Sequence, residues 1–296
     1  MDDSAHDAQH DRTPRWLFPA IALGVIAAVA WGERRNRLRP ASGQREGPRI
    51  ATNLAMAGMT AVVTQATMAP VVEPLSEWVE EREVGLVQAL PLSAAVRDAL
   101  AIVLLDYTLY WWHRVEHRVP FIYRFHQVHH ADLDLDSSTA ARFHFGEFLL
   151  SVPWRAAQVL LIGASPRALG LWNKLSMLSV IFHHSNVRLP IDIERTLARL
   201  FVTPRLHGIH HSIVREEQDS NWSSGLTIWD RLHGTYRANV PQREIEIGVP
   251  ALRNPEDVTL TRSMIAPFEP LPEWTLPDGS TPRAGRRLVP TGLLAR

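Results

Sequence analysis

The sequence predicts an all-α integral membrane bundle that carries a histidine-rich, metal-binding cap on the cytoplasmic side. Three observations support this fold class. Several long stretches are apolar and nearly free of charge, the loops between them differ in arginine content, and histidines recur at helical spacing. About four membrane-embedded helices are expected, together with a hairpin that either re-enters or spans the membrane.

The bulk composition narrows the classes of function. The chain has 296 residues, long enough for one large or two ordinary domains, with 31 basic and 31 acidic residues and no cysteine. No basic stripe indicates a nucleic-acid partner. Without cysteine, a disulfide framework, a zinc ribbon and an iron-sulfur cluster are all excluded.

The N-terminal part contains the first predicted crossings. Residues 1–15 are polar and are expected to be a disordered tail, and residues 16–95 form the transmembrane region. Residues 16–31 are uncharged and begin and end with tryptophan, which favours a first crossing or an uncleaved signal anchor; residues 50–72 form the second. The loop 33–49 holds six arginines, whereas residues 73–83 hold one arginine and five glutamates. The first loop should therefore face the cytoplasm of an inner or cell membrane.

The later apolar segments return the chain to the cytoplasmic side. A third crossing is expected at about residues 86–112, interrupted by Pro91, Arg97 and Asp98. Residues 148–162 and 169–182 flank GASPR, a turn signal, and predict a helical hairpin. Residues 241–296, rich in proline and charge, are expected to form an irregular C-terminal tail.

Histidine motifs dominate the middle of the chain. Residues 111–130, WWHRVEHRVPFIYRFHQVHH, hold five of the fourteen histidines, and RLHGIHHS repeats the HxxHH spacing. On a helix, residues three and four apart share a face, so each motif can direct its imidazoles at one point. Neutral imidazole binds iron, zinc, copper or nickel, and eight imidazoles exceed what one ion needs, so the count predicts two ions. The candidate ligands are His113, His117, His126, His129, His130, His207, His210 and His211.

Two other functions remain open. HRVEH also matches HxxEH, an inverted zinc-peptidase motif in which Glu116 would be the general base. That interpretation leaves both HxxHH motifs without a role, and Glu116 is otherwise expected to be a solvated helix residue beside Arg114. The second alternative is a catalytically silent metal-binding membrane protein.

The three motifs in this order resemble the signature of the fatty acid hydroxylase/sterol desaturase superfamily, which are membrane-bound non-haem di-iron oxygenases. DYTLYWWHRVEH, STAARFHFGE, FHHSNVRLP, TPRLHGIHHS and DSNWSSGLTIWDRLHGTY also resemble blocks of that family, and they cover residues 96–237. The bacterial sterol-desaturase-like members are the most similar. The resemblance implies a catalytic domain at residues 96–240. It also implies that the eight histidines bind metal, with His144 and His184 completing the coordination.

The neighbours of His184 raise a choice of ligand. Adjacent histidines on a helix point about 100° apart, so only one of His183 and His184 readily faces the site. His184 is preferred because it directly precedes Ser-Asn, and His183 and Asn186 are expected to lie beside the ligands.

Two carboxylates are candidates for supporting roles. Asp106 lies seven residues before His113, on the same helical face, and is expected to orient an imidazole or to be a satisfied polar residue near a helix end. Glu147 is the other nearby carboxylate. His233, in WDRLHGTY, is expected to pack.

The resemblance implies a dioxygen-dependent hydroxylase or desaturase acting on a C–H bond of a fatty acyl, sterol or other terpenoid lipid. The implied cofactors are two irons, which zinc can replace, and dioxygen is the co-substrate. No flavin, nicotinamide or cytochrome signature is present, so an external electron donor such as a cytochrome, a ferredoxin or a reductase is expected.

Overall fold

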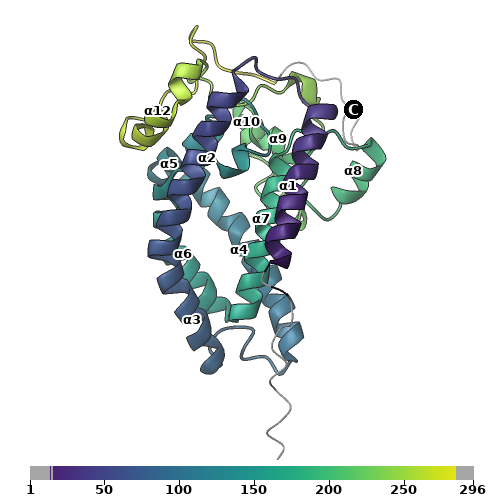
Figure 1. The fold of residues 1–296 in the computed structure, drawn as a ribbon, viewed down its shortest axis with the longest axis vertical. Helices are drawn as coiled ribbons and strands as arrows, with labels where there is room; N and C mark the ends of the chain where they lie inside the picture. Colours follow the sequence, from purple (N-terminus) through teal and green to yellow (C-terminus); the bar gives the residue numbers. More distant parts are fainter. Residues whose placement is uncertain (1–13, 15, 285–296) are drawn as a thin grey trace, which may run out of the picture.

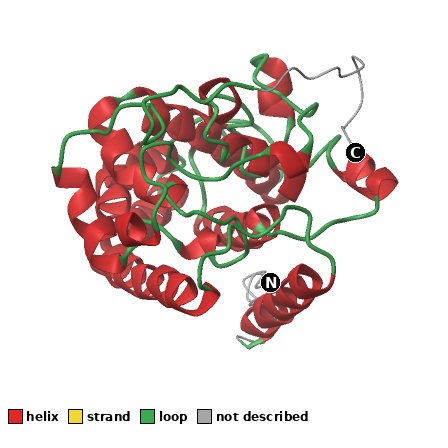
Figure 2. Ribbon diagram, turned by 90° about the horizontal axis from the view of Figure 1, so that it is seen from above, coloured by secondary structure: helices red, strands yellow, loops and turns green. Residues whose placement is uncertain are grey.

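The computed structural model describes residue 14 and residues 16–284, and helices are the main regular secondary structure of this part of the chain. It contains four isolated bridges and no β-strand. Figure 2 shows the helices as a cluster beneath a layer of loops. The expected tail 1–15 therefore lies, except for residue 14, outside the described residues. The prediction of an all-α fold is confirmed for the described part.

Six long helices, one of them interrupted by a π-helical turn, form the bundle and the start of the cap in the described part of the chain. Figure 1 shows α2 and α3 on one side of the bundle, α1 on the other, and α5, α9 and α10 together at one end. The long elements are α1 (Leu17–Arg35), α2 (Glu46–Val63), η1 (Thr64–Met68), α3 (Ala69–Glu81), α4 (Ala94–Arg118), α5 (Pro120–His130), α6 (Phe145–Ile162) and α7 (Pro166–His184).

The remaining elements are single turns or short helices, most of them in the cap. They are η2 (Thr139–Ala141), α8 (Ile191–Leu197), α9 (Pro204–His210), α10 (Arg215–Gln218), α11 (Ile228–Leu232), η3 (Gln242–Glu244), η4 (Pro255–Val258), α12 (Leu260–Ile265) and η5 (Ala266–Phe268). The expected irregular tail is thus coil and short turns in its described part, and residues 285–296 lie outside that part. The described part of this tail is packed against the cap: Val249 and Val258 are buried, and Trp274 donates its indole N–H to the carbonyl of Ile213.

Three described helices are long and apolar enough to cross a membrane: Leu17–Arg35, Glu46–Glu81 and Phe145–Ile162. Their outward side chains include Trp31, Val62 and Leu161, each about two thirds exposed, as expected of surfaces that face lipid. Residues 94–112 of the expected crossing at 86–112 are helical within α4, whereas residues 86–93 form turns and coil; the second arm of the hairpin is helical within α7. They carry more polar residues and are not among these three helices.

The expected acidic loop at 73–83 is instead mostly helical, since α3 continues to Glu81. The charges of this segment had suggested a loop. Pro70 has no N–H to donate to the preceding turn, and the wider π-helical turn of η1 lies immediately before it. The π-helical turn accommodates this missing N–H, so the 36-residue helix continues.

Prolines also fix where the histidine helices begin. Pro120 is the first residue of α5 and Pro204 the first residue of α9, so each HxxHH motif lies near the end of a short helix. The helix α6 ends at Gly163, whose φ of 83° is the left-handed conformation that glycine adopts without strain.

A small apolar core joins α3, α4, α6 and α7. Ala101, Ala164 and Ala168 are fully buried there and allow the backbones to approach closely, while Leu105 and Trp172 fill the remaining space. This packing fixes the positions of α4, α6 and α7 along the bundle axis, and hence where their cap-side ends lie.

Buried charge connects the bundle to the cap. The guanidinium of Arg49, on α2, pairs with Asp132 at 3.0 Å. Arg142 is fully buried and donates to the carbonyls of Val128 and Val258 and to the side chain of Asn53. If α2, α5 or the C-terminal segment moved relative to the others, buried hydrogen bonds would break. These contacts therefore hold the three elements in one arrangement.

Candidate metal centre

The histidines of the three motifs converge at the junction of the bundle and the cap. In each of two groups, one nitrogen from every histidine lies within 4.8 Å of the others, and all these residues are buried. The first group comprises His113, His117, His126, His130 and His210, and the second comprises His129, His184, His207 and His211.

Each HxxHH motif contributes to both groups. On α5, His126 and His130 belong to the first group and His129 to the second; on α9, His207 and His211 belong to the second and His210 to the first. Residues four apart point only about 40° apart around the helix, whereas the remaining histidine of each motif is turned about 60° and about 100° from the other two and so faces the other group. The α5 motif therefore gives two histidines to the first group and one to the second, and the α9 motif gives one to the first and two to the second. The rings of His130 and His211 stack at 4.3 Å, so the two groups are adjacent.

The nitrogen separations fit ligands that share an ion. In the second group, His184 lies between His129 and His207, with Nε2–Nε2 distances of 3.0 Å to each, and His211 lies 3.0 Å from His207. In the first group, the Nε2 atoms of His126 and His130 are 3.2 Å apart. Two nitrogens bound to one ion at about 2.1 Å, with an angle of about 90–110°, are roughly 3.0–3.4 Å apart.

Backbone carbonyls set the orientation of four imidazoles. The Nδ1–H groups of His113, His129, His184 and His210 donate to the carbonyls of Trp222, Arg142, Val180 and Ser220, at 2.7, 3.1, 2.8 and 2.9 Å. A ring that donates from Nδ1 keeps the lone pair of Nε2 free, and this is the usual arrangement of a metal-binding histidine.

The cap histidines are neutral and partly without protein partners. Burial and the neighbouring imidazoles hold the pKa of His207 and His211 well below its usual range, and burial together with His126 lowers that of His210 to about 3. Nε2 of His210 and both ring nitrogens of His117 are buried with no hydrogen-bond partner. An unpaired buried polar atom costs about 1–3 kcal/mol, and metal coordination would remove that cost. The donor set therefore fits two metal ions.

The structure does not bring His144 into either group. It is the N-cap of α6, where Nδ1 accepts a hydrogen bond from the backbone N–H of Gly146 at 2.9 Å. Its Nε2 lies 3.3 Å from the carbonyl of Met264, to which it donates. Both ring nitrogens are thus engaged within the protein.

Of the adjacent pair, the second group contains His184 and not His183. His183 is buried beside it, with its ring 4.1 Å from that of His207. Asn186 lies farther from the imidazoles: its side chain accepts from the backbone N–H of Arg39 and donates to the carbonyl of the same residue. These bonds connect the end of α7 to the loop after α1.

Asp106 holds a cap segment rather than an imidazole. Its Oδ2 accepts from the indole N–H of Trp229 at 2.7 Å and from the backbone N–H of Leu226 at 3.0 Å. The carboxylate thus attaches the segment around α11 to α4. His233 packs as expected, with its ring stacked on those of Tyr107 and Tyr110.

Two buried glutamates flank His126. Its Nδ1 is 3.2 Å from Oε1 of Glu147 and 3.8 Å from Oε2 of Glu116. The expectation that Glu116 is solvated is wrong, since only 5% of its surface is exposed. The helical spacing could have indicated that Glu116 is buried beside the histidines, because Glu116 lies three residues after His113 and therefore on the same face.

A cavity of about 640 Å³ leads away from the histidines into the bundle. His113, His126, His129, His184 and His207 lie at one end of it, and the rest of its wall comes from α2, η1, α3, α4, α6 and α7. Most of these wall residues are apolar. The arrangement can place an apolar molecule next to both histidine groups.

Comparisons with known proteins point to one family. A family model described as fatty acid hydroxylase matches residues 99–235. The chain is 32% identical to the ornithine lipid hydroxylase OlsE of Rhizobium tropici, over 52% of this chain and 46% of that protein. It is 31% identical to alkylglycerol monooxygenase of Homo sapiens, over 45% and 29% of the two chains.

A longer alignment exists with cholesterol 25-hydroxylase of Mus musculus, at 24% identity over 75% of this chain and 72% of that protein. The alignments with OlsE and with alkylglycerol monooxygenase each span less than half the length of those relatives. No solved structure matches the chain.

Proposed function

Residues 99–235 of this chain belong to the fatty acid hydroxylase family, and from this premise we propose that the protein is a membrane-bound, di-iron, dioxygen-dependent hydroxylase of a lipid C–H bond. One observation carries the proposal: nine buried histidines form two ligand groups at the inner end of a cavity that runs between apolar helices. The named relatives are hydroxylases and monooxygenases, which favours hydroxylation over desaturation.

The chain itself performs three tasks in this proposal. The nine histidines would hold the two irons, which supply the activation of dioxygen when bound. Backbone carbonyls orient the rings of His113, His129, His184 and His210, and the carboxylate of Glu147 lies 3.2 Å from Nδ1 of His126. Burial of the ligand groups excludes water, and the cavity wall positions the lipid. His144, which caps α6, is left out of the proposed ligand set.

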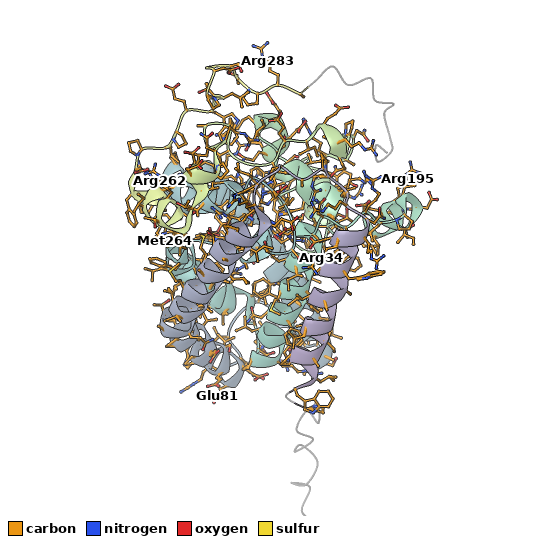
Figure 3. All side chains as sticks on the ribbon, turned by 45° about the horizontal axis from the view of Figure 1, so that its top comes forward. Arg34, Glu81, Arg195, Arg262, Met264 and Arg283 are labelled. Atoms are coloured by element: carbon orange, nitrogen blue, oxygen red, sulfur yellow. The ribbon has the colours of Figure 1, made fainter. Side chains whose placement is uncertain are left out.

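The cap is proposed to face the cytoplasm. Arg34 and Arg35 end α1 near the cap, while Glu81 lies at the opposite end of the bundle, as Figures 1 and 3 show. Arginine-rich short loops stay on the cytoplasmic side. This orientation would let a separate cytoplasmic donor, such as a ferredoxin, a cytochrome or a reductase, deliver electrons to the histidine groups.

The alternatives fit the geometry less well. A zinc peptidase would use His113 and His117 with Glu116 as the base, yet Glu116 lies beside Glu147 and His126. Seven histidines of the two groups would then have no role. A silent metal-binding protein would bind the ions without consuming dioxygen.

The test combines metal analysis with lipid analysis. The protein purified into lipid nanodiscs should contain about two irons per chain and consume dioxygen when a reductant is supplied. A strain deleted for the gene should lack an oxygenated lipid that the complemented strain contains. Iron binding without dioxygen consumption or a lipid difference would support the silent alternative.

A further inference from the structure

One arginine interrupts the apolar wall of the cavity. Arg155 lies on α6, ten residues after its start and therefore roughly 15 Å along a helix long and apolar enough to cross the membrane. A guanidinium near the middle of a membrane helix costs about 2.5–3.5 kcal/mol on insertion scales, so such a residue usually has a functional partner.

The protein supplies only part of that partner. Nη1 of Arg155 donates to Oε1 of Gln158 at 3.0 Å, and Nε2 of Gln158 donates to the hydroxyl of Thr108 at 2.6 Å. These bonds fix one edge of the guanidinium. Among the described residues, no carboxylate forms an ion pair with Arg155. The carboxylate of Glu116 attracts the guanidinium from beyond ion-pair distance.

A second donor without an acceptor lies against the same guanidinium. The ring of Trp172, on α7, faces the Cζ atom of Arg155 at 4.8 Å, and both residues line the cavity. The indole Nε1 of Trp172 is buried with no hydrogen-bond partner. Because a buried N–H without an acceptor is unfavourable, the indole of Trp172 favours an incoming acceptor, and the adjacent guanidinium can donate to the same group.

We propose that Arg155 and Trp172 bind the acyl oxygen of the lipid substrate, a carboxylate or an acyl carbonyl, while its chain extends toward the histidines. A guanidinium binds a carboxylate through two parallel N–H···O bonds, and at membrane depth few other lipid groups offer such an acceptor. A cavity of about 640 Å³ is also the size of a site for one small ligand, which fits a single acyl chain. This inference rests on the proposed function and names its substrate class.

Binding without turnover tests the proposal. Zinc-loaded protein in nanodiscs is titrated with hexadecanoate, hexadecanamide and hexadecane, each competing with a spin-labelled fatty acid. The wild type should bind the acid and the amide more tightly than the hydrocarbon. Arg155→Met should weaken binding of the acid roughly tenfold or more, because a charge-assisted hydrogen bond contributes about 1.5–3 kcal/mol, and should leave hexadecane unchanged. Preference for the acid over the amide would identify a carboxylate, and equal binding an acyl carbonyl.

Trp172→Phe removes the indole N–H and keeps a smaller aromatic ring over Arg155, so it should weaken binding of the acid and of the amide roughly fivefold. Trp154→Phe is the matched control. The indole N–H of Trp154 is likewise buried without a partner, but its side chain is not part of the cavity wall, so binding should not change. If Arg155→Met does not fold, Arg155→Lys is the alternative variant. It keeps the positive charge but removes the planar guanidinium with its paired N–H donors, so it should still weaken binding of the acid several-fold.

Equal wild-type affinity for hexadecane and hexadecanoate would overturn the proposal, as would an equal loss of both in the Arg155 variants. Its failure is distinguishable from failure of the proposed function. An iron-loaded wild type that consumes dioxygen but shows no acyl preference refutes only the substrate class. A wild type that binds the acid yet holds no iron refutes only the di-iron function.

Discussion

The Nε2 atom of His184 lies 3.0 Å from the Nε2 atom of His129, although 55 residues separate them in the chain. His184 ends α7 and belongs to none of the HxxxH or HxxHH motifs. It therefore joins the bundle to the cap at the second ligand group, and a defect there should be separable from one in the first group.

Removing one ligand from each group should affect one ion. The second group keeps three imidazoles in His129→Ala, and the first group keeps four in His117→Ala. In each variant the occupancy of one iron site should decrease, so the iron content should fall from about two per chain toward one. Metal analysis of the purified variants measures this, and both should lose hydroxylation. Full activity in His129→Ala would instead favour the peptidase alternative.

Substituting His144 should reduce stability rather than metal content. His144→Ala removes the cap of α6, which costs about 0.5–2 kcal/mol of unfolding free energy, whereas His144→Asn retains an acceptor for the N–H of Gly146. Thermal unfolding should therefore show a lower midpoint for the alanine variant than for the asparagine variant. Loss of one iron in both variants would show that His144 is a ligand after all.

Glu147 should act on metal affinity through His126. Glu147→Ala removes the nearer of the two carboxylates beside Nδ1 of His126, and the loss of such a neighbour of a metal-binding imidazole commonly weakens metal binding 10–100-fold. Chelator competition should show one weakened ion of the two. Glu147→Gln, whose amide oxygen can still accept, should fall between the alanine variant and the wild type. The exposed Glu81→Ala is the control and should match the wild type.

Asp106 should matter for folding and not for the ions. Asp106→Ala leaves the N–H groups of Trp229 and Leu226 unpaired, with an expected loss of about 1–3 kcal/mol of unfolding free energy for each that stays buried. Unfolding measured by circular dichroism should show this loss while iron content stays near two per chain. Unchanged stability with reduced iron would restore an imidazole-orienting role.

The sequence anticipated the helical fold because apolar runs and the helical spacing of the histidines are local signals. The starts of α5 and α9, at Pro120 and Pro204, were not predicted. The segment after Glu73 was misjudged, since its charges suggested a loop. Its continuation as α3 depends on packing against α6, which no local pattern contains.

Motif spacing alone predicted clustered imidazoles that could bind metal in an all-helical membrane protein, because residues three and four apart on a helix share a face. Only the tertiary structure decided how the histidines divide between two groups, that His144 lies in neither group, and that Glu116 and Arg155 line a common cavity. The physical reason is that each ligand group combines side chains from several helices. Their relative rotation and height are set by long-range packing, which is not a property of any single segment.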